Sequence, residues 1–273
     1  MDQLIRRAAE AIASADAILI GAGAGMGVDS GLPDYRGSEG FWKAYPPFKK
    51  LGLSFAALAD PQWFYRDPSL AWGFYGHRMH LYRDTVPHAG FALLKAWANR
   101  TRLGAWAYTS NVDGQFQKVG FDRVLEIHGS IHRMQCLRRC GQRVFSADSF
   151  NVTVDPETMR AEGDFPSCPR CRVLARPNIL MFGDGGWDLG PVSNSRAEYY
   201  CWLEALEGSR VVTIECGAGT AIPSVRAACL NVARLFNGTL IRINPREAEV
   251  PDGHIGLPMG SLAALEAISR HQV

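Results

Sequence analysis

The sequence predicts an α/β fold, a mainly parallel sheet with helices on both faces, and a smaller domain beside it. Several short apolar runs lack the alternation of half-buried strands, as expected when both faces of a parallel strand are covered. Stretches with helical periodicity separate several of these runs. A glycine-dense turn, Gly21–Gly27, directly follows the first of them.

The individual elements follow from this pattern in chain order. Residues 2–15 place apolar side chains at helical spacing, and the buried strand Asp16–Ile20 comes next. Further strands are predicted at Trp106–Thr109, Val124–Ile127, Asn178–Phe182, Arg210–Ile214 and Thr239–Ile243. Helices are predicted over residues 88–99, 195–207 and 221–236.

Two segments interrupt the alternation. Residues 37–84 are rich in aromatic side chains and helical in rhythm, whereas residues 134–175 hold two close cysteine pairs and little core-forming sequence. We expect them to form a helical module and a cysteine module that together make the small domain. The large domain then comprises residues 1–36, 85–133 and 176–273.

The composition limits the classes of protein. Of 273 residues, 47% are hydrophobic and 21% are charged, as in an ordinary globular chain. The formal charge of +2 is too small to indicate a nucleic-acid or membrane partner, and no apolar run is long enough to span a bilayer. An odd number of cysteines, seven, and an N-terminus unlike a signal peptide predict a cytoplasmic protein. The sequence makes no prediction of oligomeric state.

The glycine-dense turn indicates a nucleotide, because glycines let the backbone approach a phosphate closely. It does not match the dinucleotide fingerprint G-x-G-x-x-G, since Met26 or Val28 falls at the third glycine position. A glycine-rich turn without a ligand is the alternative. Arg36, a few residues further on, can contact a pyrophosphate or ribose, or form a surface ion pair.

The four clustered cysteines indicate a metal. Cys136 and Cys140 are separated by three residues, Cys168 and Cys171 by two. Four thiolates suit a tetrahedral structural zinc ion, and such a closed site leaves no position for a catalytic water. An iron–sulfur cluster or four unrelated thiols are the alternatives.

His128 is the candidate catalytic base. It ends the apolar run Leu125–Ile127 and precedes Gly129. An imidazole titrates near neutral pH, so it can take a proton from a hydroxyl group and return it. A hydrogen-bonded structural histidine is the alternative.

In chain order these motifs resemble those of the sirtuin family, NAD-dependent protein-lysine deacylases. Thr109–Asp113 resembles the family's T-Q-N-I-D motif, His128–Gly129 its catalytic pair and Arg176–Asp184 its R-P-x-x-x-x-F-G-E segment. The remaining matches are Gly23–Arg36, the four cysteines, Gly217–Pro223 and Ile243–Asn244. The resemblance runs from about residue 18 to 245, and the ordered set is more specific than any single motif.

The resemblance implies a Rossmann-like large domain and a small zinc-containing domain, with NAD and an acylated protein lysine bound between them. The acyl oxygen would attack the ribose carbon that carries nicotinamide. His128 would then deprotonate a ribose hydroxyl, which attacks the alkylimidate intermediate, and hydrolysis would yield lysine, nicotinamide and O-acyl-ADP-ribose.

Site residues are carried over from the resemblance motif by motif. His128 and Asn111 would be catalytic, Asn111 ordering the ribose or a water, and Asp113 would hold the nicotinamide amide. The implied NAD contacts are Gly23, Ala24, Gly25, Asp34, Tyr35, Arg36, Ser110, Asn111, Asp113, Gly217, Ala218 and Asn244.

The sequence also departs from the family pattern. Ser110 replaces a glutamine, Gly27 a serine, and Gly217–Gly219 a G-T-S turn, while Asp184–Asp188 lacks the usual glutamate and proline. The changes at Ser110 and in Gly183–Asp188 keep an NAD-dependent ADP-ribosyltransferase or NAD glycohydrolase on the same fold as an alternative. A non-enzymatic NAD-binding module is less well supported, because a pure binder needs neither His128 nor Asn111.

Tyr75 and Arg78, in the helical module, resemble the Y-x-x-R motif of sirtuins that remove succinyl and malonyl groups. Residues three apart share a helix face, so the pair could bind an acyl carboxylate, which an arginine fork recognises well. An aromatic packing residue beside a solvated arginine is the alternative.

Overall fold

A six-stranded parallel sheet forms the large part of the molecule. The computed structural model describes residues 1–34 and 37–272, with the backbone alone for residues 37–39. The strand order is β11-β10-β9-β1-β2-β3, and every pairing is parallel. The strands are β1 (Ala17–Ala22), β2 (Ala105–Thr109), β3 (Val124–Glu126), β9 (Val211–Cys216), β10 (Thr239–Ile243) and β11 (Ile255–Leu257).

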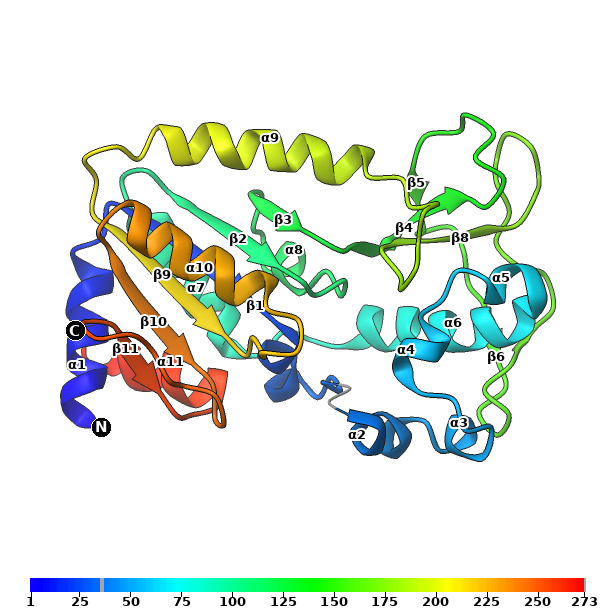
Figure 1. Cartoon of the computed structure of the whole chain (residues 1–273), viewed down its shortest axis with the longest axis horizontal. Helices are drawn as coiled ribbons and strands as arrows, with labels where there is room; N and C mark the ends of the chain where they lie inside the picture. Colours follow the sequence, from blue (N-terminus) through cyan, green and yellow to red (C-terminus); the bar gives the residue numbers. More distant parts are fainter. Residues whose placement is uncertain (35–36, 273) are drawn as a thin grey trace.

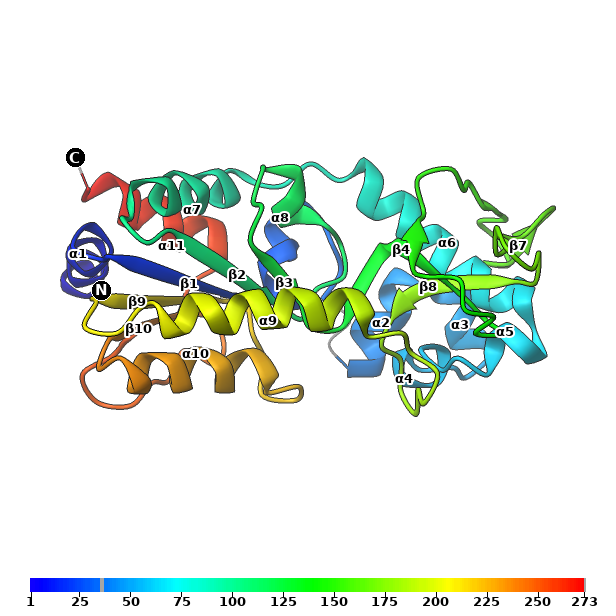
Figure 2. The same ribbon diagram turned by 90° about the horizontal axis from the view of Figure 1, so that it is seen from above.

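Helices cover both faces of this sheet (Figures 1 and 2). On β1, Ile18 and Ile20 pack in one apolar cluster, whereas Ala17 and Leu19 pack in another, because successive side chains of a strand point to opposite faces. The first cluster takes in α1 (Asp2–Ala13), α7 (Ala89–Arg100) and α11 (Ser261–Arg270), and the second takes in α9 (Gly190–Glu204) and α10 (Ser224–Leu235). The predicted fold class is therefore confirmed.

The strand order reverses between β1 and β9. The chain adds β2 and β3 on one side of β1, and β9, β10 and β11 on the other. Ligands of open α/β sheets bind beyond the carboxyl ends of the strands at such a reversal. The loops that follow β1, β2, β9 and β10 meet at this edge, and η1 (Ala24–Ser30), a 3-10 helix, continues the first of them.

The helical module has an aromatic core. It contains α2 (Gly37–Ala44), α3 (Pro46–Lys50), α4 (Phe55–Leu58), α5 (Trp63–Arg66) and α6 (Pro68–Asp84). Helix α6 begins sharply because Pro68 occupies its first turn and Asp67 caps it, accepting a hydrogen bond from the Leu70 N–H. Buried rings from the module, among them Phe41, Phe48 and Phe74, pack at centroid distances of 5.9 to 6.0 Å.

The cysteine module is built on a second, antiparallel sheet. Its strand order is β5-β4-β8, with β4 (Gly129–Cys136), β5 (Phe145–Ser146) and β8 (Ala175–Ile179). A short hairpin, β6 (Thr153–Val154) and β7 (Ala161–Glu162), packs on α6. Figure 1 shows this module and the helical module at the same end of the molecule.

The prediction of a main-sheet strand at Asn178–Phe182 is wrong. The strand there is β8, residues 175–179, and it pairs antiparallel with β4 instead of joining the main sheet. Both of its faces are covered, as all five residues of β8 are buried, so its apolar run looked like that of a parallel strand. The short strand β11, the C-terminal helix α11 and the single turn α8 (Gln115–Lys118) were not predicted. None of the helices in the described part of the chain is long and apolar enough to span a bilayer.

Candidate active site

The glycine loop after β1 packs directly against the loop after β9. The Gly25 N–H donates to the Gly217 carbonyl at 3.0 Å, and a Cβ atom on Gly25 would lie 2.8 Å from the Gly217 Cα. Gly217 also has φ +63°, a conformation that favours glycine. These glycines are therefore required by the close approach of two backbones. Between their glycines, the two loops carry only the small side chains of Ala24 and Ala218.

The loop after β2 is joined to the glycine loop by hydrogen bonds. The Ser110 N–H donates to the Ala22 carbonyl at 3.2 Å, and the Asn111 side-chain amide donates to the Gly23 carbonyl at 3.0 Å. The Thr109 hydroxyl accepts from the Asn111 N–H at 3.0 Å. The structure thus brings Ser110 and Asn111 next to the glycine loop, although they lie far apart in sequence.

His128 occupies the connection between the two sheets. The parallel pairing of β2 with β3 continues to Ile127, whose N–H donates to the Thr109 carbonyl at 2.9 Å. The next residue, His128, is consequently held beside Ser110. Burial lowers the pKa of His128 below 6.5, and a hydrogen bond with the Ser110 backbone opposes this shift. The imidazole is therefore neutral at pH 7 and able to accept a proton.

Asp113 has a fully buried carboxyl group. Its Oδ1 accepts a hydrogen bond from the Gln115 N–H at 3.0 Å. Burial raises the pKa of Asp113 to about 6, and this hydrogen bond together with the positive charge of Arg78 opposes the rise. The carboxylate is mostly charged at pH 7 and can accept hydrogen bonds from an amide.

Two further predicted NAD contacts hold the loops after β9 and β10. The buried Asn244 donates from its amide to the Ala218 carbonyl at 2.9 Å, and its Oδ1 accepts from the Arg246 and Glu247 N–H groups. Asp34 pairs with Arg246 at 3.3 Å between Oδ2 and Nη2. Tyr35 and Arg36 lie outside the described residues.

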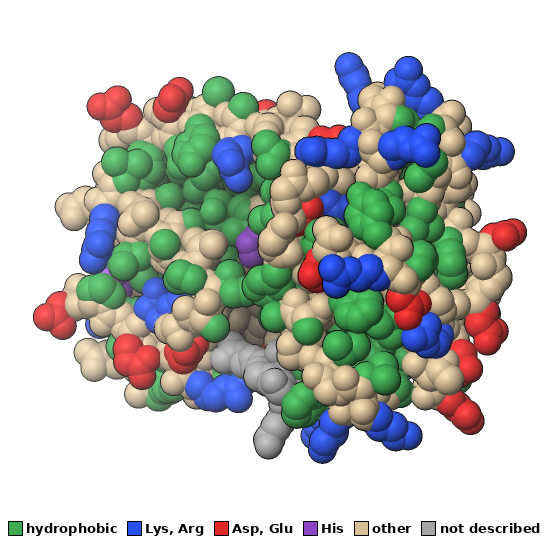
Figure 3. Space-filling view, turned by 45° about the vertical axis from the view of Figure 1, so that its right-hand side comes forward, with side chains coloured by type: hydrophobic (Ala, Val, Ile, Leu, Met, Phe, Trp, Pro, Cys, Tyr) green, Lys and Arg blue, Asp and Glu red, His purple; other side chains and the backbone are tan. Residues whose placement is uncertain are grey.

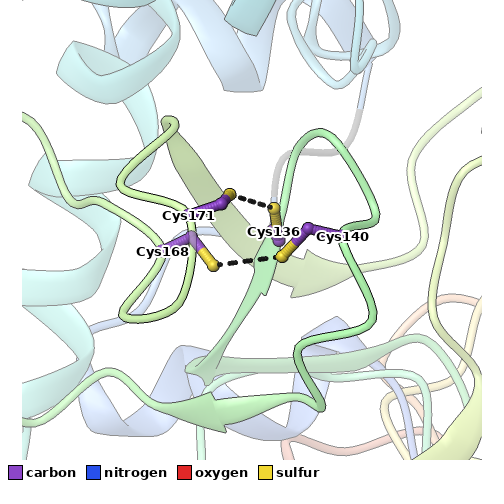
Figure 4. A group of neighbouring side chains, drawn as sticks. All are labelled: Cys136, Cys140, Cys168 and Cys171. Carbon is purple, nitrogen blue, oxygen red and sulfur yellow. Dashed lines mark hydrogen bonds between the residues drawn. The ribbon is translucent and has the colours of Figure 1, made fainter.

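The four predicted metal ligands form one cluster, drawn in Figure 4. Their sulfur atoms all lie within 4.8 Å of one another. The Cys136–Cys171 and Cys140–Cys168 sulfur pairs are each 3.6 Å apart, close to the roughly 3.8 Å that a tetrahedral ion with 2.3 Å Zn–S bonds requires. The donor set and its spacing therefore fit a zinc ion.

Tyr75 and Arg78 lie on α6 and both are buried. The Arg78 guanidinium donates from Nε and Nη2 to the Tyr82 hydroxyl at 3.1 and 2.8 Å. It also lies 5.2 to 5.7 Å from the ring centroids of Phe55, Phe74, Tyr75 and Tyr82. The Tyr75 hydroxyl is buried without a hydrogen-bond partner among the described residues, and burial raises its pKa to about 12. The alternative prediction, that Arg78 is a solvated arginine, is wrong because its side chain is buried.

Several residues that shape the site were missed in the sequence. Asp184 forms a buried ion pair with Arg176, at 2.8 Å between Oδ2 and Nη1, and accepts from the Gly186 N–H. It thereby organises the segment counted above as a departure. The Leu180 N–H, just after β8, donates to the main-chain carbonyl of His128 at 2.9 Å. Of these residues, only Asp184 could have been found in the sequence, because its carboxylate follows Arg176 by eight residues across an apolar run.

The fold and these loops define a class of protein: an open α/β protein with glycine-rich loops where the strand order reverses, and a four-cysteine module inserted beside the sheet. On the face drawn in Figure 3, the surface is hollowed between the two parts, and a histidine side chain is visible there.

The chain belongs to the Sir2 family. The model of this family matches residues 23–189, which include the glycine loop, His128 and all four cysteines. This match confirms the sirtuin resemblance found in the motifs.

Individual relatives agree with this assignment. An NAD-dependent protein deacylase of Aeropyrum pernix is 32% identical, over 91% of this chain and 89% of the relative. An NAD-dependent protein deacetylase of Saccharolobus solfataricus is also 32% identical, over 77% and 74%. A solved Sir2 homologue in complex with ADP-ribose is 25% identical, with a TM-score of 0.68 over 97% of this chain and 95% of that one.

Proposed function

We propose that the protein is an NAD-dependent protein-lysine deacylase that releases nicotinamide and O-acyl-ADP-ribose. The observation that carries this proposal is the position of the half-buried imidazole of His128, beside Ser110 and at the sheet edge where the glycine loops meet; burial lowers its pKa, which favours the neutral form. A general base must be neutral at working pH to accept a proton. The names of the relatives, deacylase and deacetylase, support the same reaction class.

The residues present fit NAD. The glycines and alanines of Gly23–Gly25 and Gly217–Ala218 carry no large side chain, so a pyrophosphate can approach the main chain of these loops. We assign Asn111 to the ribose, Asp113 to the nicotinamide amide and His128 to deprotonation of a ribose hydroxyl. Bound NAD supplies an electrophilic ribose carbon with nicotinamide as the leaving group.

Zinc, held by the four cysteines, has a structural role in this proposal. Four thiolates complete a tetrahedral site and leave no position for a substrate or water. The ion would hold the loop after β4 against the loop before β8, which keeps the small sheet in place beside His128.

The reaction class is tested by mass spectrometry of the products formed from NAD with acetyl-, succinyl- and longer acyl-lysine peptides. O-acyl-ADP-ribose together with the free lysine peptide is the expected result. ADP-ribosylated peptide, or ADP-ribose formed without acyl transfer, would overturn the proposal in favour of a transferase or glycohydrolase.

We further propose that Arg78 and Tyr75 recognise a carboxylate at the end of the acyl group. Arg78 influences the pKa of Asp113, so its charge reaches the region assigned to nicotinamide. The buried Tyr75 hydroxyl, without a partner among the described residues, supplies a donor next to it. An arginine fork can bind both oxygens of a carboxylate, which is the group at the end of a dicarboxylic acyl chain.

The Arg78→Met variant tests this specificity. We expect desuccinylation to fall at least about 100-fold, and more than deacetylation, because a bidentate charge pair is lost. Arg66→Met, at an exposed position of the same module, is the control and should leave both activities unchanged. Equal loss of both activities in Arg78→Met would contradict the specificity role.

The substrate lysine lies on a protein in this proposal, as the names of the relatives suggest. We also propose a cytoplasmic location, which is supported by the seven cysteines, none of which forms a disulfide in the structure.

A further inference from the structure

A cavity of about 640 Å³, lined mostly by polar residues, lies next to the Asp113–Gly114 turn. It opens between the end of α6, the turn α8 and the strands β3, β4 and β5. His132 and Gly114 both line it. His132 therefore lies at the boundary of this cavity, in contact with the Asp113–Gly114 turn.

The imidazole of His132 binds the backbone of Asp113. Its Nε2 lies 2.9 Å from the Asp113 carbonyl oxygen. A carbonyl oxygen only accepts hydrogen bonds, so Nε2 carries the proton and donates. The neighbouring carbonyl, that of Val112, accepts from the Ile131 N–H at 3.0 Å. Two successive carbonyls of this loop are thus held by β4.

An irregularity in β4 turns this part of the strand towards the loop. Ser130 pairs with Asn178 of β8 and Met134 with the adjacent Pro177, so the three residues between them have no partner there. The His132 carbonyl instead accepts from the Ala147 N–H of the cysteine module at 3.0 Å. His132 consequently connects that module to the Asp113 turn.

The His132 ring also limits the conformation of the turn. Gly114 has φ +72°, and a Cβ atom there would lie 2.7 Å from the ring. This left-handed residue allows the Gln115 N–H to reach the Asp113 carboxylate at 3.0 Å. Asp113 is thus held at two points: its main-chain carbonyl binds His132, and its side-chain Oδ1 binds the Gln115 N–H. Together these bonds fix the direction of its carboxylate.

We propose that His132 is a positioning residue for the nicotinamide end of NAD, acting through the main chain of Asp113. The inference rests on the proposed function, because that function gives Asp113 its ligand. His132 does not touch the reacting atoms in this proposal. It orients the carboxylate that holds the nicotinamide amide before and after the bond to ribose breaks.

The test compares His132→Ala and His132→Gln with the wild type. Loss of the hydrogen bond should raise the KM for NAD and the inhibitory concentration of nicotinamide about fivefold each, with kcat at saturating NAD changed by less than about twofold. His132→Gln should recover most of both values, because its Nε2 can donate to the same carbonyl. Ser146→Ala, in the lining of the same cavity, is the control and should behave as wild type.

Thermal unfolding of each variant separates positioning from folding. A lower Tm of His132→Ala with unchanged KM and nicotinamide inhibition would overturn the inference, as would failure of His132→Gln to recover them. If the wild type binds NAD in calorimetry without turnover, the proposed function fails, and the same comparison made on Kd still decides the role of His132. Absence of NAD binding by the wild type would overturn both.

Discussion

At the scale of single residues, the site depends on groups whose protonation is set by burial. His128 has its pKa lowered by burial, and Asp113 has its pKa raised to about 6 by the same cause. In both cases burial disfavours the charged form. At pH 7 His128 is neutral, whereas Asp113, with a pKa of about 6, is still mostly charged.

The His128→Ala variant should lose about 100-fold or more in kcat while retaining NAD binding, because only proton transfer is removed. Calorimetry of NAD binding is the control measurement. Turnover close to that of wild type would mean that another group is the base.

The activity of the wild type should also depend on pH in a defined direction. The base is active when neutral, and the folded pKa of His128 lies below its ordinary 6.5. As pH falls through that value the imidazole gains a proton, and Asp113 is protonated near pH 6. We expect kcat/KM for NAD to be constant around pH 7 to 8 and to fall below about 6.5. A loss of activity that begins above pH 7 would contradict the lowered pKa of His128.

Gly217→Ala should destabilise the protein more than Gly253→Ala. Both residues have positive φ, but a Cβ atom on Gly217 meets the Gly25 backbone, whereas nothing lies within 4 Å at Gly253. The control should cost about 1 kcal/mol from backbone conformation alone, and Gly217→Ala should exceed it and also weaken NAD binding. Urea unfolding measures the stability of both variants, and calorimetry measures their NAD binding. Equal losses of stability would mean that the contact between the two loops adds nothing.

At the scale of elements, the cysteine module depends on two loops rather than on a core of its own. Cys136 ends β4 and Cys140 follows in the next turn, while Cys168 and Cys171 precede β8. The sheet between them has only three strands, and β5 has two residues. A metal that joins these loops would replace much of the missing apolar burial.

Cys140→Ser should weaken zinc affinity by more than about 100-fold, since even outer-shell partners of a metal contribute 10- to 100-fold. Cys201→Ser, at an exposed cysteine on α9, is the matched control. Zinc content by atomic absorption and the Tm should both fall in Cys140→Ser alone. Full zinc content in that variant would exclude the four-thiolate site.

At the scale of the whole molecule, two sheets meet at His128. Strand β3 of the large sheet ends at Glu126, and β4 of the small sheet begins at Gly129. A Cβ atom on Gly129 would collide with the Asn178 carbonyl of β8. Strand β8 can therefore pack closely against the residue after His128 only because Gly129 has no side chain. The catalytic residue thus lies where the chain crosses from one part to the other.

The large sheet also contains a buried ion pair. Glu215 on β9 and Arg242 on β10 form two hydrogen bonds, at 2.6 and 3.0 Å, with side chains 0% and 6% exposed. Arg242→Met would leave a buried carboxylate without its partner, and we expect a loss of about 3 to 5 kcal/mol in unfolding free energy. The double variant Glu215→Leu/Arg242→Met should recover much of this loss, and Arg6→Met, in an exposed pair, should change little. Denaturant unfolding of the three variants measures these values; a double variant no better than Arg242→Met would contradict the explanation.

Much of this architecture could be predicted from periodicity. Most strands of the large sheet were predictable, because a strand covered on both faces is a continuous apolar run. The helices between them were predictable from the helical spacing of their apolar side chains. Strand β8 could not be assigned to its sheet, because an apolar run covered on both sides looks the same in either sheet. His132 could not be found at all, since its role depends on a bulge in β4 and on a carbonyl nineteen residues earlier.

The sequence by itself determined the residue types: a histidine able to act as base, four thiolates with the spacing of a metal site, and a glycine-dense turn. Only the tertiary structure decided which of them act together. The parallel register of β2 and β3 holds His128 beside Ser110, and the contact between the loops after β1 and β9 explains the glycines. Hydrogen bonds and burial depend on distance in space, and folding sets that distance for residues far apart in the chain.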